Sequence, residues 1–440
     1  MQQHFYYLAD YLGTKLTGDE LFLATFDGER SDFARFNHSL IRQAGSVTQR
    51  YFTLDLINGQ RHAKSTVTLS GDPGIDKARL DALLAELRDE LPRVPDDPYL
   101  LYSTDMHSTE VHGDNMLPNR DEAISQIIKA GEGRDLVGIY ASGGIFTGFA
   151  NSLGQRNWFS SYSFNLDWSV YLKADKAVKT SYAGFAWDVG EFGRKAETAA
   201  RQLDMLARRP RTIKPGMYRV YLSPAALNEF VAMLAWGGFS LKAHRTKSTS
   251  LLKMIEQGVT LSPAVTIREN SREGIAPNFQ SAGYIKPDAV TLIGKGQYRE
   301  CLVSPRSAKE YGVPPNGAGS GESPESVDMD GGEIPHDDVL QQLGTGVCIN
   351  QLWYLNYSDR PACRITGMTR FATFWVEDGK IKAPLNVMQF DETAYRVLGE
   401  NLLGLTKERD FIPDPHTYEA RSTGSARLPG ALVKDFAFTL

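Results

Sequence analysis

The sequence predicts an α+β protein of two domains, an N-terminal antiparallel sheet with packed helices over 1–210 and a β-rich domain over 217–440. Three observations carry this prediction. The chain of 440 residues is long enough for two large domains. Runs of alternating apolar and polar residues occur in both halves. A basic, proline-broken segment, ARRPRTIKPG, separates the halves at about 209–216.

The composition is that of an ordinary globular protein. Apolar residues make up 42% and charged residues 23%, which excludes wholesale disorder. The net charge of −5 offers no polycationic surface, so no nucleic-acid partner is expected. No run reaches the roughly 18 apolar residues that span a bilayer, and the N-terminus lacks a secretory pattern. We therefore expect a cytoplasmic protein with no membrane partner, and three cysteines agree with a reducing compartment.

The first strands predict an antiparallel meander. A glycine-bearing loop at 28–30 is suited to a hairpin, and Asn58-Gly59 is the strongest two-residue hairpin signal in the chain. The strands are expected over 21–27, 31–37, 47–57 and 61–70. After Ser70 the spacing of apolar residues changes from that of a strand to that of a helix, because leucines recur at helical spacing from Leu80 to Leu91. Asp72 can cap the N-terminus of this helix, which should lie on the sheet.

The clearest strand in the sequence runs over 156–173. Apolar side chains from Trp158 to Leu172 occupy even positions, and serine, asparagine and aspartate occupy most of the odd ones, so one face should be buried and the other polar. Helical patterns over 121–130 and 190–209 flank this region. Glycines in the preceding strand indicate a bulge or close backbone packing; they are Gly143, Gly144 and Gly148.

The second half opens with a strand and a helix over 224–236, with Ser223 as the cap and an apolar stripe on one face. The low-complexity stretch 312–332 is expected to be a mobile surface loop. Further strands are expected over 347–357, 364–377 and 380–387, and at the C-terminus over 431–440. An amphipathic helix is expected around 393–403.

Few residues suggest chemistry by themselves. His107 and His112 with Glu110 match the residue types of a zinc site, but their polar context favours a surface loop. Cys348 lies among strand-forming neighbours, where a free cysteine usually packs as a small apolar side chain. His416 lies in a proline-broken turn, where a lone histidine is usually solvated.

Several strings, taken in order, resemble the TldD/PmbA family, also called the TldD/TldE or modulator-of-gyrase zinc-peptidase family. They begin with SDFARFNHSLIRQAGSVTQRYFTLDLINGQRHA, YRVYLSPAALNEF and SREGIAPN, and they end with MDGGEIPHDDVLQQLGTGVCI, FATFWVEDGKIKAPL and LPGALVKDFAFTL. The resemblance covers nearly the whole chain. It implies a peptidase-type cleft, with Asn278, Cys348 and His416 as candidate cleft residues.

The resemblance also implies where a metal would bind. In the TldD branch the helix after YRVYL carries His-Glu, three residues and His, and a cysteine near the C-terminus completes the zinc ligands. The matching positions here are Ala232, Met233 and Gly237, and the cysteine position falls close to His416. Alanine and glycine offer no lone pair, and methionine cannot act as a general base. The chain therefore resembles the TldE/PmbA branch, and no metal ligand or catalytic residue is assigned.

Three functions remain open at this stage. The first is a non-catalytic subunit that pairs with a TldD-like catalytic subunit, which would hold the zinc, and binds a peptide substrate. Strand addition at sheet edges or along the polar face of 156–173 would supply the peptide contact. The second is a stand-alone hydrolase that uses Cys348 or His416, and the third is a homodimeric peptide-binding scaffold.

Overall fold

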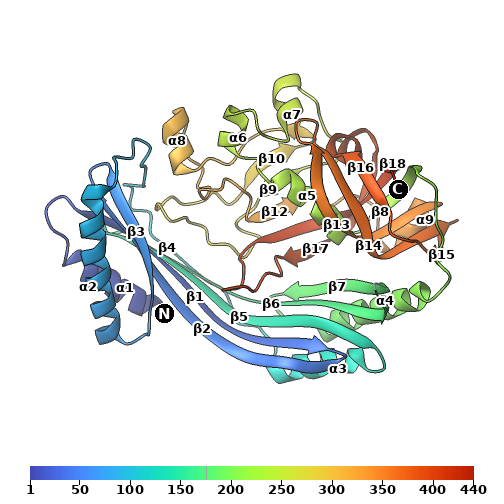
Figure 1. The fold of residues 1–440 in the computed structure, drawn as a ribbon, viewed down its shortest axis with the longest axis horizontal. Coiled ribbons are helices and arrows are strands. Elements are labelled where there is room, and N and C mark those ends of the chain that lie inside the picture. Colours follow the sequence, from blue (N-terminus) through green and yellow to red (C-terminus); the bar gives the residue numbers. More distant parts are fainter. Residues whose placement is uncertain (175) are drawn as a thin grey trace.

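The computed structural model describes residues 1–174 and 176–440 and arranges them as two β-sheets with packed helices (Figure 1). The predicted α+β class is confirmed. The N-terminal sheet has the strand order β3-β2-β1-β5-β6-β4, with β7 beside β6. Its strands are β1 (Leu21–Asn37), β2 (Leu40–Asn58), β3 (Arg61–Thr68), β4 (Thr109–His112), β5 (Asp135–Asn151), β6 (Arg156–Lys173) and β7 (Lys176–Gly184). Its helices are α1 (Gln2–Gly13), α2 (Pro73–Glu90), α3 (Arg120–Gly131) and α4 (Val189–Leu206), with a 3-10 turn at Leu91–Arg93.

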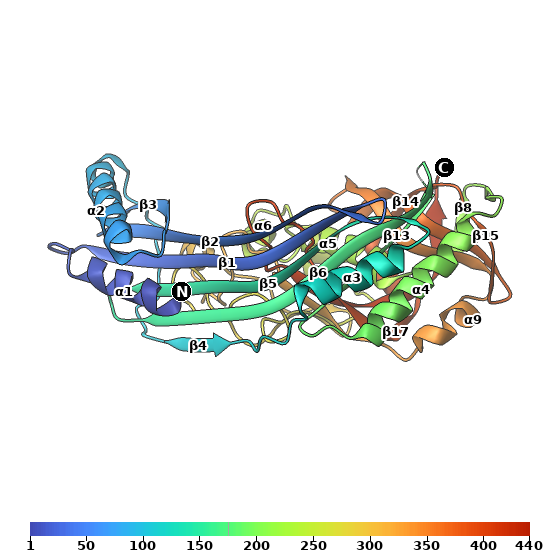
Figure 2. The same cartoon turned by 90° about the horizontal axis from the view of Figure 1, so that it is seen from below.

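Four long, curved strands, β1, β2, β5 and β6, form the body of this sheet (Figure 2). At one end α1 and α2 cover one face, where even-numbered side chains of β1 such as Phe22 and Phe26 join Phe5 and Leu80 in a buried cluster. At the other end α3 and α4 pack on the sheet around Tyr140 in a second cluster. Burial of these apolar faces fixes which side of each strand remains open.

One predicted hairpin is wrong. β1 runs without a break through residues 28–30, and the chain reverses instead at His38 and Ser39, whose φ angles are 50° and 59°. Gly28 serves packing, because a Cβ there would lie 2.6 Å from the ring of Phe26. The hairpin at Asn58-Gly59 is confirmed, since Asn58 pairs with Arg61 across the turn. His38-Ser39 is not one of the glycine-containing pairs that mark a two-residue hairpin, which explains why the first turn was not predicted.

The strand predicted over 156–173 is confirmed as β6. The glycines of β5 reflect close packing: a Cβ on Gly143 would lie 2.2 Å from the carbonyl oxygen of Arg30 on β1. His107 and His112 flank and end β4, a short strand that pairs with β6, where a polar loop had been expected.

The C-terminal sheet has the order β11-β10-β9-β12-β18-β16-β14-β13-β8, with β15 beside β14 and β17 beside β18. Its strands are β8 (Gly216–Leu222), β9 (Ile267–Glu269), β10 (Val290–Gly294), β11 (Gln297–Tyr298), β12 (Ser326–Met329), β13 (Gly346–Asp359), β14 (Arg364–Glu377), β15 (Lys380–Pro384), β16 (Gln389–Thr393), β17 (Leu402–Pro413) and β18 (Ser425–Phe438). Its helices are α5 (Pro224–Ala235), α6 (Leu241–Arg245), α7 (Leu252–Gln257), α8 (Pro305–Tyr311) and α9 (Val339–Leu343), with short turns at His336–Asp338 and Arg396–Glu400.

Helix α5 lies at the centre of this second core. The hydroxyl of Ser223 accepts a hydrogen bond from the Ala226 amide at 3.1 Å, as a capping residue should. Leu227, Phe230 and Leu234 are buried and belong to the main cluster with β8, β13 and β18. Among the described residues no helix is long and apolar enough to cross a membrane.

Two further expectations are wrong. The stretch 312–332 is not simply a surface loop, because it contains β12 and the carboxylate of Glu322, which is 1% exposed and accepts hydrogen bonds from Ser240 and Ser304. The polar groups of this stretch form hydrogen bonds to buried protein groups. Amino-acid composition does not show whether a polar group is bonded to protein or to water. The helix expected around 393–403 is only a five-residue turn, because Gly399 has non-helical backbone angles and β17 begins at Leu402.

Candidate functional site

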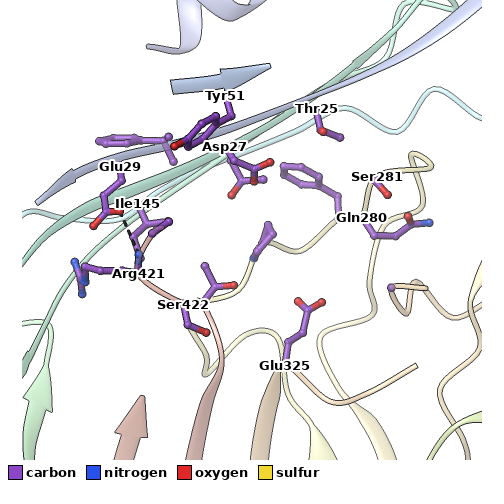
Figure 3. A pocket seen from close by; sticks show the side chains of 18 of the residues that line it. Thr25, Asp27, Glu29, Tyr51, Ile145, Gln280, Ser281, Glu325, Arg421 and Ser422 are labelled. Carbon is purple, nitrogen blue, oxygen red and sulfur yellow. Dashed lines mark hydrogen bonds between the residues drawn. The ribbon is translucent and has the colours of Figure 1, made fainter. Parts of the chain in front are cut away.

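A cavity of about 560 Å³ lies between the open face of the N-terminal sheet and loops of the C-terminal half (Figure 3). One wall is formed by side chains of β1, β2 and β5, and the other by segments 277–286, 319–325 and 420–423. This volume is within the range of small-ligand sites. The cavity is therefore the candidate functional site.

The polar wall follows from strand alternation in β1. Even-numbered residues such as Phe26 point into the core, so the odd-numbered Thr25, Asp27 and Glu29 point into the cavity. Tyr51 on β2 and Thr147 on β5 pair with Asp27 and extend the same wall to both sides. A sheet with one packed face thus presents a polar second face to the C-terminal half.

Two smaller cavities continue the space along β1. One, of about 230 Å³, shares Thr25 and Gln280 with the first, and another, of about 390 Å³, shares Glu29 and Gln49. The three together follow β1 from Leu23 to Arg35, which is roughly 40 Å at about 3.3 Å per residue. We call this space the interdomain groove. Its length suits an extended chain.

Arg421 links the two halves across the groove. Its guanidinium donates hydrogen bonds to the Gly143 carbonyl at 3.1 Å, the Ser163 carbonyl at 3.0 Å and the Ser163 hydroxyl at 2.8 Å. Burial lowers the pKa of Arg421 to about 10, and the nearby carboxylate of Glu29 opposes this effect. The residue is therefore still charged near neutral pH, and it fixes the loop 414–424 on the N-terminal sheet.

Glu29 and Asp27 differ in their partners. Glu29 is 3% exposed, and its Oε2 accepts hydrogen bonds from the Arg421 amide at 3.1 Å and the Gln49 amide group at 3.2 Å. Its Oε1 has no hydrogen-bond partner within the described chain. Burial raises the pKa of Asp27, which Lys64 lowers to a smaller extent.

The opposite wall carries a closed ion pair. Lys286 donates to Glu325 at 2.6 Å, and Lys286 is almost fully buried. Behind it lies Glu269, whose pKa is raised by burial although it accepts hydrogen bonds from the amides of Glu325 and Ser326. These groups satisfy one another and stabilise the loops that face β1.

The three candidate cleft residues have different positions. Asn278 lies between two residues of the cavity wall, Pro277 and Phe279, and its Oδ1 is buried without a partner in the described residues. His416 is exposed in the loop 414–424 and lies outside the residues that line the cavity. Cys348 packs between two apolar clusters on β13, where burial raises the pKa of its thiol to about 12.

The positions matched to the zinc helix do not fit a metal. Gly237 follows the C-terminal end of α5, and a Cβ there would lie 2.7 Å from Nη2 of Arg360. That guanidinium also donates to the Trp236 carbonyl at 2.6 Å, so a cationic group lies beside Trp236 and Gly237. Within residues 1–174 and 176–440, no group of three His, Cys, Asp or Glu residues is placed to hold a metal ion.

Strand addition along β6 is wrong as a mode of binding. β6 pairs with β5 on one edge and with β4 and β7 on the other. The odd-numbered residues of β6 face the C-terminal half; those from Asn157 to Ser163 are buried, and those from Asn165 to Tyr171 are half-buried. A ligand can therefore contact the polar face of this sheet, but it cannot extend β6.

Sequence reasoning did not find Asp27, Glu29 or Arg421. The acidic residues carried a usable signal, because they continue the odd positions of a strand that begins with apolar side chains at positions 22, 24 and 26. The false hairpin at 28–30 hid that alternation. Arg421 carried no signal, since its partners on β1, β5 and β6 are more than 250 residues away.

The two-sheet fold with a groove between its halves is that of an α+β protein. Residues 215–440 match the family model described as the PmbA/TldA metallopeptidase C-terminal domain, and the chain belongs to this PmbA/TldD family. A comparison with curated protein sequences finds no match.

Solved structures share the whole fold. A putative modulator of DNA gyrase from Thermotoga maritima is 15% identical, with a TM-score of 0.76 and coverage of 99% of both chains. TldE from Thermococcus kodakarensis is 15% identical, with a TM-score of 0.75, over 99% of this chain and 100% of that one. A putative modulator of DNA gyrase from Bacteroides thetaiotaomicron is 14% identical, with a TM-score of 0.76, over 99% and 98%. At these identities the likeness concerns the fold.

Proposed function

We propose that this chain is a non-catalytic, TldE/PmbA-like subunit of a heteromeric zinc metallopeptidase and that it contributes a groove for an extended peptide. The partner would be a TldD-like subunit that carries the zinc and the water-activating glutamate. The chain by itself holds no zinc in this proposal.

The observation that carries the proposal is the chemistry at the end of α5. Ala232, Met233 and Gly237 supply neither a nitrogen nor an oxygen ligand from their side chains, and zinc in proteins is held by Cys, His, Asp or Glu. Arg360 adds a positive charge next to Gly237. A divalent cation would meet repulsion there instead of a ligand.

The groove supports the peptide-binding part. It is long, it has a polar floor of Thr25, Asp27 and Glu29, and it has apolar side walls that include Ile145 and Phe279. An extended peptide places side chains alternately, so such a floor can contact every second residue. The hydrolase alternative finds less support, because Cys348 has a pKa of about 12 and lies outside the groove.

The test is co-expression with a His-Glu-xxx-His paralogue from the same genome, followed by mass, zinc and peptidase measurements. The proposal expects far less than one zinc per purified chain, no peptide cleavage by the chain alone, and zinc-dependent cleavage by the heteromer. Zinc-dependent cleavage by the isolated chain would refute it. A stable homodimer that ignores the paralogue would support the scaffold alternative instead.

A matched pair of variants tests the groove within the heteromer. Thr147→Trp places an indole in the cavity beside Asp27, whereas Thr48→Trp places one on the exposed outer face of β2. We expect the first variant to lower peptide turnover at least tenfold and the second to leave it within twofold. Equal peptide turnover by both variants would show that the groove does not bind the peptide substrate.

A further inference from the structure

The charges on the cavity wall do not cancel. Its lining contains three carboxylates, Asp27, Glu29 and Glu325, and two cations, Lys286 and Arg421. Lys286 is paired with Glu325 at 2.6 Å, and the guanidinium of Arg421 is directed at carbonyl and hydroxyl oxygens. The wall formed by β1 therefore keeps an excess of negative charge.

Asp27 is the carboxylate without a protein partner. Within the described residues no hydrogen bond or ion pair to its side chain is found, and Lys64, the cation that acts on it, lies beyond ion-pair distance. Solvent in the groove reaches the Asp27 side chain, although protein surrounds it closely enough to raise its pKa. The group is thus open to a ligand and poorly compensated by the protein.

Glu29 gives an independent indication of a ligand. Glu29 is only 3% exposed to solvent. Even so, its Oε1 has no hydrogen-bond partner in the described chain. A buried carboxylate oxygen without a donor is costly, at about 1–3 kcal/mol or more for a charged group. Figure 3 shows Asp27 and Glu29 on the same side of β1, facing into the cavity.

We propose that Asp27 and Glu29 bind an ammonium group of the peptide that occupies the groove. This inference rests on the proposed peptide-binding function and names its specificity. An ammonium has three donors and no acceptor, which matches a surface of carboxylate oxygens that lack donors. The group comes from a lysine side chain or from the N-terminus of the peptide.

The test uses fluorescence anisotropy of the purified full-length chain with labelled ten-residue peptides of Ala, Ser and Gly. The first peptide is blocked at both ends and carries a central lysine. The second is the same peptide with the lysine acetylated on its side-chain nitrogen (N-acetyl-lysine). The third has a free N-terminus and no lysine. We expect the lysine peptide or the free-amine peptide to bind at least tenfold more tightly than the N-acetyl-lysine peptide. The peptide that binds more tightly shows whether the ammonium group comes from a lysine side chain or from the N-terminus.

Asp27→Asn removes the charge with little change in shape, and Asp32→Asn is the matched control on the same strand. Asp32 contacts Ser46 and Arg120 outside the groove. We expect Asp27→Asn to reduce the tenfold preference to within twofold by weakening binding of the ammonium-bearing peptide, and Asp32→Asn to keep the preference.

Three results would overturn the inference, and they are distinguishable. Equal binding of all three peptides, abolished by Thr147→Trp, would leave the peptide groove intact and remove only its preference for an ammonium group. Binding of none of the peptides would contradict the peptide-binding function itself. Retention of the preference in Asp27→Asn would show that the ammonium binds elsewhere.

Discussion

Replacement of Arg421 by methionine should release the loop 414–424 from the N-terminal sheet. The substitution keeps much of the length of the side chain but removes every donor. The contacts that disappear are the hydrogen bonds to the Gly143 carbonyl, to both oxygens of Ser163 and to the Ser31 hydroxyl. The amide of Arg421 also donates to Glu29, so release of the loop would expose that amide to exchange with solvent.

The size of the effect follows from these contacts. A hydrogen bond that involves a charged group contributes about 1.5–3 kcal/mol, but the groove admits water that can replace part of the lost donors. The four bonds are therefore expected to contribute about 2–3 kcal/mol in total to the free energy of loop opening. That change corresponds to an increase of roughly 30- to 150-fold in the opening equilibrium.

Hydrogen–deuterium exchange with mass spectrometry measures this equilibrium directly in peptides that cover 414–424. Arg208→Met is the control, since Arg208 is exposed and no contact of its side chain is found in the described structure. We expect faster exchange in the loop for Arg421→Met only. Exchange within twofold of the unchanged protein would show that the loop is held by other contacts and that Arg421 does not link the halves.

Three further predictions address the strands around the groove. Burial raises the pKa of Asp27 above its ordinary value of 3.8, so the folded state binds this proton more tightly than the unfolded state does. The folded protein therefore loses stability as the pH rises from 3.8 through the raised pKa. In urea titrations, Asp27→Asn should be more stable than the unchanged protein at pH 7.5 and equal to it below about pH 3.8. Gly143→Ala should cost about 1–3 kcal/mol through contact with the backbone of β1, whereas Gly45→Ala on open β2 should change stability by about 0.5 kcal/mol or less, as thermal unfolding will measure. The Cys348 thiol, with a pKa of about 12, should resist maleimide at pH 8 in the folded protein, and Cys348→Ala should retain peptide binding; rapid labelling would contradict the raised pKa of this partly buried thiol.

Local patterns predicted the strongly periodic elements well. β6 was predicted at its observed bounds because apolar side chains occupy every even position from Tyr162 to Leu172. The start of α5 was found because Ser223 and Pro224 are a capping pair. The prediction of a helix over 393–403 is wrong because Gly399 interrupts the helical backbone. The prediction of a surface loop over 312–332 is wrong because amino-acid composition does not reveal buried hydrogen bonds.

The candidate site was only partly predictable for a related reason. Asn278 was named from a family-like string and lies in a segment of the cavity wall, whereas His416 lies in the correct loop but is exposed. The residue of that loop that reaches the sheet is Arg421. Which of several polar residues enters a groove depends on how the loop folds against a distant strand.

The sequence by itself determined the class of fold, the polar face of the N-terminal sheet and the lack of metal-binding side chains at 232, 233 and 237, since each of these depends on residue type and on the period of its neighbours. Only the tertiary structure decided that the polar face becomes the floor of a groove, that Arg421 crosses it and that Arg360 lies beside Gly237. These contacts join segments more than one hundred residues apart, and only the packing of one sheet against the other brings them together.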